Sequence, residues 1–143
     1  MSKTTHELVQ RAIAAAGTAY APYSNFHVGA ALLLESGEIV TGSNFENASY
    51  GMTLCAETVA IAKANSDGQL NAIREIAVAG GLAGHVGKAA DPITPCGRCR
   101  QIIKEVADLT DTDIPVHCAH ATGYETFKLS ELLPHGFGPA NLK

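Results

Sequence analysis

Tryptophan is absent from the 143 residues, and aromatic residues make up only 6% of them. Charged residues are also few, at 17%, with 10 Lys and Arg against 14 Asp and Glu. The basic residues are scattered, without the positive stripe that follows a phosphate backbone in nucleic-acid-binding proteins. This balance, a formal net charge of -4, disfavours a nucleic-acid partner and favours a small molecule with few phosphates or none.

Long apolar runs are missing as well. The longest, Val28 to Leu34, is far shorter than the ~20 residues that span a bilayer, so we expect no membrane segment. The stretch from Met1 to Glu7 is polar and unlike a secretory signal, which predicts a cytoplasmic protein. In that compartment the 4 cysteines are more typical of metal ligands or catalytic groups than of disulfides.

The periodicity of apolar residues predicts one domain, residues 1–143, with a mixed sheet between helices. A hairpin comes first and strands then alternate with helices, which is typical of a three-layer α/β/α fold. The first predicted helix follows a capping box of Thr4 and Glu7. Further helices are predicted at 55–64 and 96–109, and a short helix is predicted to start within 129–134. The predicted strands cover 27–35, 38–41, 75–79 and 114–118, and 80–87 is expected to be a flexible connection.

Three of the four cysteines stand where helices are predicted to start. Cys55 opens one helix, and Cys96 and Cys99 occupy positions i and i+3 of another, so their sulfurs can share one side of a turn. A helix N-terminus favours thiolate over thiol. Three thiolates leave the fourth position of a tetrahedral zinc open, as catalytic sites do. We therefore predict Zn²⁺ on these three residues, and a buried core position for Cys118.

Glu57 lies two residues after Cys55, where its carboxylate can reach both a metal-bound water and a substrate. Zinc lowers the pKa of such a water toward about 7, and a placed carboxylate can carry protons. This combination is what hydrolytic deamination requires. A structural zinc site or a redox pair of cysteines is the alternative, and the open fourth position beside Glu57 speaks against both.

The segments Cys55–Glu57 and Pro95–Gln101 resemble the metal motifs of the small homotetrameric zinc-dependent cytidine deaminases. Similar segments follow in the family's order at Tyr23–Ala31, Asn44–Tyr50 and Leu132–Pro139. The resemblance implies the cytidine deaminase fold and the hydrolytic deamination of cytidine and deoxycytidine, a reaction of pyrimidine salvage. It also implies that Glu57 is the catalytic acid and base, as in zinc deaminases generally.

The resemblance further assigns substrate-binding residues. It implies that Asn44 and Glu46 contact the ribose, that Phe26 packs on the pyrimidine, and that Ala56 adjoins the substrate. Phe137 would reach the pocket of a neighbouring subunit in a homotetramer. Plainer roles stand beside these: Asn44 and Glu46 could stabilise a turn, Phe26 could be a core residue, and Phe137 could anchor its own chain.

Two features depart from the family pattern. Many relatives carry arginine directly after the glutamate, whereas this chain has Thr58. Three thiolates and Zn²⁺ sum to -1, so without that cation we expect a less acidic bound water unless the helix N-termini, Arg98 or Arg100 compensate. The segment Gly80 to Thr94 is also longer than in compact relatives, and is either a surface insertion or part of the pocket rim.

These departures leave other functions open. Blasticidin-S deaminases, which act on a cytosine-bearing antibiotic, also lack the arginine, and N4-modified or otherwise base-modified cytidines are further candidate substrates. A catalytically silent, zinc-stabilised oligomer is the alternative outside the enzymes.

Overall fold

Five strands and four α-helices make up the computed structural model, which describes residues 2–143; Met1, in the polar N-terminal stretch, lies outside them. The helices are α1 (Ser2–Ala15), α2 (Ala56–Ser66), α3 (Gly97–Thr110) and α4 (Leu129–Leu132). The strands are β1 (Phe26–Leu34), β2 (Ile39–Ser43), β3 (Ile73–Leu82), β4 (Pro115–His120) and β5 (Gly123–Lys128). Within the described range, no helix combines the length and the apolar composition needed to cross a membrane.

The strands form one mixed sheet in the order β2-β1-β3-β4-β5. All neighbours are antiparallel except β3 and β4, where Val78 pairs with Cys118 in parallel. Parallel neighbours need a crossover connection, and here the crossover contains α3. In β1, Phe26 pairs with Leu82 and Gly29 pairs with Ser43, so the start of β1 lies beside the carboxyl ends of β3 and β2.

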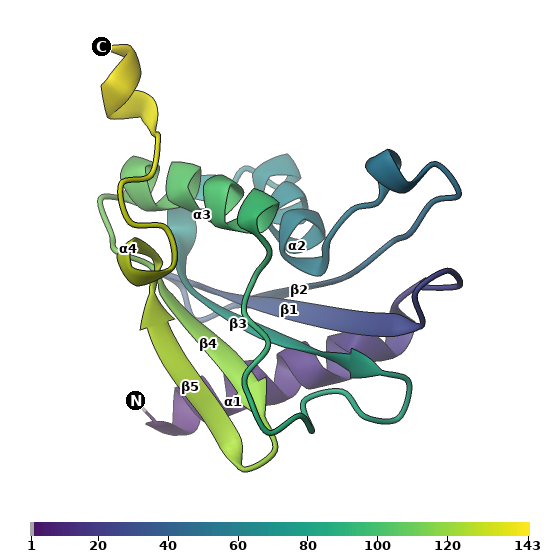
Figure 1. The fold of residues 1–143 in the computed structure, drawn as a ribbon. Coiled ribbons are helices and arrows are strands. Elements are labelled where there is room, and N and C mark those ends of the chain that lie inside the picture. Colours follow the sequence, from purple (N-terminus) through teal and green to yellow (C-terminus); the bar gives the residue numbers. More distant parts are fainter. Residues whose placement is uncertain (1) are drawn as a thin grey trace.

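Helices cover both faces of this sheet, α1 on one and α2 with α3 on the other (Figure 1). Side chains alternate across β1: Ala31 belongs to the buried cluster under α1, and Leu32 to the larger cluster under α2 and α3. The larger cluster joins Ile76 of β3 and Ile103 of α3. The predicted three-layer α/β/α arrangement with a mixed sheet is therefore confirmed.

Two local predictions were wrong, and one strand was missed. Helix α1 begins at Ser2, so Thr4 lies inside it and does not cap it. Gly80 and Gly81, predicted to be flexible, continue β3, because pairing with β1 holds their backbone extended in spite of low strand propensity. Strand β5 was not predicted: its half-buried aromatics, Tyr124 and Phe127, are three residues apart and break the two-residue period of a strand.

Two glycines let the helices approach the sheet closely. A Cβ atom on Gly29 of β1 would collide with the backbone at Ala12 of α1 and at Ala16, which directly follows this helix. A Cβ atom on Gly42 of β2 would lie 2.6 Å from the backbone nitrogen of Ala60 in α2. The absence of a side chain at these two positions therefore sets the height of both helix layers above the sheet.

Gly29→Ala is expected to lower the free energy of unfolding by about 1–3 kcal/mol, the usual cost of overpacking a core, because backbone rather than a flexible side chain blocks the new methyl group. Urea unfolding followed by circular dichroism measures the change. Gly17→Ala is the matched control, since a Cβ atom there meets nothing within 4 Å. Equal stability of the two variants would contradict the packing argument.

Candidate metal centre

The three predicted cysteines come together at the starts of α2 and α3. Cys55 immediately precedes α2, and its carbonyl accepts the first helical hydrogen bond, from Val59 N at 3.0 Å. Cys96 precedes α3 in the same manner, and Cys99 lies in the first turn. Their sulfur atoms all lie within 4.8 Å of one another, and those of Cys55 and Cys96 are 3.7 Å apart.

This cluster fits a zinc ion. Two sulfurs bound at about 2.3 Å to a tetrahedral zinc lie roughly 3.8 Å apart, close to the separation of Cys55 and Cys96. Three sulfur donors also match the preference of zinc for thiolate ligands. Cys118 stands apart from the cluster: it is buried in β4, and its sulfur faces the carbonyl of Val116 at 3.9 Å.

Neighbouring groups stabilise negative charge on the cluster. Hydrogen bonding by Cys99, helped by Cys96 and the positive charge of Arg98, lowers the pKa of Cys55 to about 6, although burial opposes the shift. Thr58 Oγ1 lies 3.5 Å from the sulfur of Cys99, so a hydroxyl stands next to this cysteine in the first turn of α2. Arg98 is a nearby cation whose charge acts on the sulfur of Cys55.

Glu57 lies in the first turn of α2 and is only 3% exposed. Burial, helped by the charge of Cys55, raises the pKa of its carboxyl group from 4.5 to about 7. A carboxyl group with a pKa near neutrality can both accept and release a proton at physiological pH. This is the property expected of a general acid and base, and the side chain that has it lies next to the sulfurs.

A pocket of about 200 Å³ opens beside the cluster, with mostly apolar walls. It is smaller than the ~300–1,000 Å³ of pockets for drug-sized ligands, which suits one small molecule. Two of the clustered cysteines, Cys55 and Cys96, line it. So do four of the predicted substrate or catalytic residues: Phe26, Asn44, Ala56 and Glu57. The remaining wall residues are Val28, Thr53, Val78, Ile93 and Thr94.

Asn44 and Glu46 already hold backbone in place. Asn44 Oδ1 accepts from Val28 N and its Nδ2 donates to the carbonyl of Phe26, both at 2.9 Å. Glu46 Oε1 accepts from the backbone nitrogens of Tyr23 and Ser24 at 3.0 and 3.2 Å, and its Oε2 accepts from the Ser24 hydroxyl. Asn44 therefore lines the pocket, whereas Glu46 is not among its wall residues, and both make the plainer turn-stabilising contacts.

Phe137 does not line the pocket of its own chain. Its side chain is 56% exposed, and its carbonyl accepts from Gln101 Nε2 at 2.9 Å, which ties the C-terminal segment to α3. The ring is therefore available to a neighbouring molecule.

Sequence reasoning missed five wall residues: Val28, Val78, Thr53, Ile93 and Thr94. The last two end the segment 80–94, so the end of that segment forms part of the pocket rim. Their position directly before Pro95 and Cys96 was the available signal, because residues next to a ligand are carried to the metal with it. Nothing in the local pattern marks Thr53 beyond its place two residues before Cys55.

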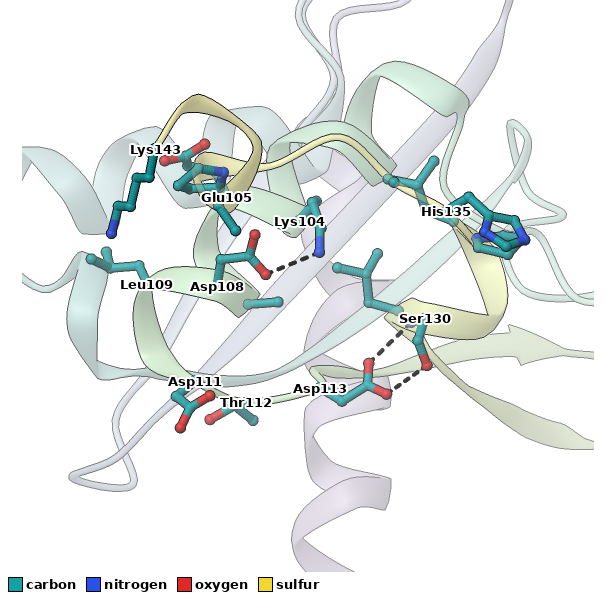
Figure 2. Close-up of a pocket in the computed structure, with 17 residues that line it drawn as sticks. Lys104, Glu105, Asp108, Leu109, Asp111, Thr112, Asp113, Ser130, His135 and Lys143 are labelled. Atoms are coloured by element: carbon teal, nitrogen blue, oxygen red, sulfur yellow. Dashed lines mark hydrogen bonds and ion pairs between the residues drawn. The ribbon is translucent and has the colours of Figure 1, made fainter.

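A larger hollow, of about 880 Å³, lies between the second half of α3 and the C-terminal segment (Figure 2). Some of its polar side chains pair with one another: Lys104 with Asp108 at 3.0 Å, and Asp113 with the backbone and hydroxyl of Ser130. Cys55, Cys96, Cys99 and Glu57 are not among the residues that line this hollow. Size alone therefore does not mark the reactive site here.

Comparison with known proteins agrees with this geometry. The model of the family "Cytidine and deoxycytidylate deaminase zinc-binding region" matches residues 2–112. A cytidine deaminase of Halalkalibacterium halodurans is 43% identical over 91% of each chain. The crystal structure of cytidine deaminase from Burkholderia pseudomallei superposes with a TM-score of 0.79 at 38% identity, covering 92% of this chain and 98% of that one. A blasticidin-S deaminase of Bacillus cereus is 36% identical over 57% of this chain and 58% of its own.

Cys96→Ser is expected to lower the zinc content of purified protein from about one ion per chain to a small fraction of that, because a thiolate ligand is lost. Mass-spectrometric metal analysis measures the content. Cys118→Ala is the control: it removes a cysteine from the core but not from the cluster, and should keep its zinc. Zinc retained by the first variant and lost by the second would contradict the ligand assignment.

Proposed function

The chain belongs to the cytidine and deoxycytidylate deaminase family, and on this premise we propose that it hydrolyses cytidine and deoxycytidine to the uridine product and ammonia. One observation carries the proposal: a buried carboxyl group, Glu57, stands on the wall of a small pocket beside a cluster of three cysteine sulfurs. A zinc ion there needs no fourth protein ligand, which is the arrangement of catalytic rather than structural sites.

Cys55, Cys96 and Cys99 would hold the zinc, which when bound supplies a Lewis acid that makes a water nucleophilic near neutral pH. Glu57 moves the protons. Its raised pKa lets it take one proton from the attacking water as C4 is attacked and pass that proton to ring N3. It then takes the second proton from the new C4 hydroxyl and delivers it to the departing amine, which leaves as ammonia. Apolar wall residues, including Val28 and Val78, limit water around these transfers.

The nucleoside would be held by the residues around the start of β1. The ring of Phe26 offers a flat apolar face to the pyrimidine, and Asn44 keeps one amide hydrogen and a lone pair free for a ribose hydroxyl. A carboxylate has about four acceptor positions, and Glu46 uses three, so a single position remains for a hydroxyl. Ala56 adjoins the ring as part of the wall.

We also propose a cytoplasmic homotetramer in which pockets are shared, with residues 1–143 forming one domain in each subunit. Exposed apolar side chains gather on the loops just before the wall residues Phe26 and Thr53, where the tilted rings of Tyr23 and Tyr50 have centroids 5.8 Å apart and Tyr50 is 74% exposed. Phe45, paired with Tyr20, and Met52 are exposed on the same loop region. Such a patch suits burial against a second copy.

The alternatives have less support. Similarity to the blasticidin-S deaminase covers little more than half of the chain, against 91% for the cytidine deaminase. A catalytically silent oligomer gives no reason to bury a carboxyl group on the pocket wall, which costs stability unless it serves chemistry.

Glu57→Ala is expected to keep its zinc and to lose about 10²–10⁴-fold in kcat, because the proton carrier is removed while the sulfurs remain. The loss of the cytidine absorbance band measures turnover, and metal analysis measures zinc. Cytidine, deoxycytidine, an N4-methylated cytidine and blasticidin S should be compared on the wild type in the same assay. Turnover of cytidine by the variant at near the wild-type rate would refute the role of Glu57, and an inactive wild type on all four would refute the function.

Phe137→Ala is expected to raise KM for cytidine several-fold, because a neighbouring pocket loses its aromatic wall. Mixed assemblies with Glu57→Ala should recover activity, since each variant supplies the group that the other lacks. Co-expression of differently tagged chains and assay of the doubly purified assembly tests this. Leu142→Ala, a change to another exposed residue of the same tail, is the control. A mixture no more active than the sum of its parts would argue against shared pockets.

A further inference from the structure

Side chains in the first turns of α3 donate hydrogen bonds to segments that lie far apart in the sequence. Arg98 donates to the carbonyl of Thr53 at 3.4 Å, and Gln101 donates to the carbonyl of Phe137. Between them, Arg100 makes three hydrogen bonds with one guanidinium group. The helix that begins after Cys96 and carries Cys99 thus also holds a pocket wall and the C-terminal segment.

Arg100 spans three parts of the chain. Its Nε donates to the carbonyl of Pro95 at 2.7 Å, directly before the ligand Cys96. One terminal nitrogen donates to the hydroxyl of Thr94 at 3.0 Å, and the other to the carbonyl of Leu132 at 2.8 Å. Thr94 is a wall residue of the pocket, and Leu132 ends α4, five residues before Phe137.

We propose that Arg100 is a positioning residue that locks the metal turn and the pocket wall at Thr94 to the C-terminal segment. Its place in catalysis rests on the proposed function, whereas its structural action does not. Through Arg100, movement of the segment that presents Phe137 to a neighbour is transmitted to the turn that holds Cys96 in its own subunit.

The chemistry of the guanidinium group makes this role specific. Its donors lie in one rigid plane and point in different directions, so a single side chain serves three acceptors at once. Lysine has a compact ammonium group on a flexible stem and cannot reproduce that geometry. Pro95 is fully buried, so its carbonyl has no ready water to replace a lost donor.

Arg100→Gln tests the proposal in the zinc-loaded protein. Transfer of zinc to a chromogenic chelator should become about tenfold faster, and amide hydrogen exchange in residues 133–139 should accelerate by a similar factor, because hydrogen bonds to both segments are lost. With cytidine, KM should rise more than kcat falls, since the wall at Thr94 loosens while Glu57 is unchanged. Arg100→Lys should restore only part of each effect.

Arg11→Gln is the control, because it makes the same charge change at an exposed position of α1, on the other face of the sheet. Thr94→Val removes a single bond while keeping the side chain's shape, and should act in the same direction but less strongly. If Arg100→Gln does not fold, this variant and Arg100→Lys still test the proposal. Combining Arg100→Gln with Thr94→Val should add little to the first change alone.

Zinc transfer and tail exchange in Arg100→Gln that match those of Arg11→Gln would overturn the proposal. So would faster zinc transfer without any change in the exchange of residues 133–139, because the metal turn would then be independent of the C-terminal segment. A wild-type protein that does not act on cytidine would overturn the proposed function instead, and the zinc and exchange measurements would still decide the role of Arg100.

Discussion

The site depends on two helix N-termini that meet over one end of the sheet, where the sulfurs of Cys55 and Cys96 are 3.7 Å apart. The sheet dictates this meeting. Helix α2 rests on β2 at a height that Gly42 permits, and α3 belongs to the crossover that the parallel pair β3 and β4 requires. The carboxyl ends of β2 and β3 and the start of β1 lie together, so Asn44, Val78 and Phe26 reach the same pocket.

Electrostatics explains why helix starts are used. Three sulfurs and a buried carboxylate concentrate negative charge in a region of low polarity, which is costly unless nearby groups offset it. The N-terminal dipoles of α2 and α3, the hydroxyl of Thr58 and the charge of Arg98 all act toward stabilising it. Arg100 is close to Arg98 in sequence, but it donates its hydrogen bonds to backbone carbonyls and to Thr94. Arg98 therefore contributes charge near the sulfurs, whereas Arg100 fixes the position of the surrounding backbone.

The part of the site that could be predicted from sequence is the part whose chemistry is local. Cys96 and Cys99 share one turn, and Glu57 follows Cys55 by two residues, so spacing alone places their side chains. The walls come from strands and loops far apart in the chain, and no local pattern indicates that Thr53 or Val78 will face the pocket. The same limit explains why the end of β3 was not predicted. The local sequence at Gly80 and Gly81 indicates a flexible connection, and only their pairing with β1 extends the strand through them.

Architecture and chemistry are not separate in this molecule, because several polar side chains serve both. Asn44, directly after β2, accepts from Val28 N and donates to the carbonyl of Phe26, which fixes the backbone at the start of β1. Asn44 also lines the pocket, with one amide hydrogen and one lone pair still free. Glu46 anchors the turn at Ser24, whose hydroxyl in turn accepts from the backbone nitrogen of Phe26. Phe26 is thus held at its oxygen by Asn44 and at its nitrogen by Ser24, which Glu46 anchors. Asn44 and Glu46 are the residues proposed to hold the ribose. A substitution at either ribose residue therefore also displaces the face on which the base would stack, and its effects on sugar binding and on base binding must change together.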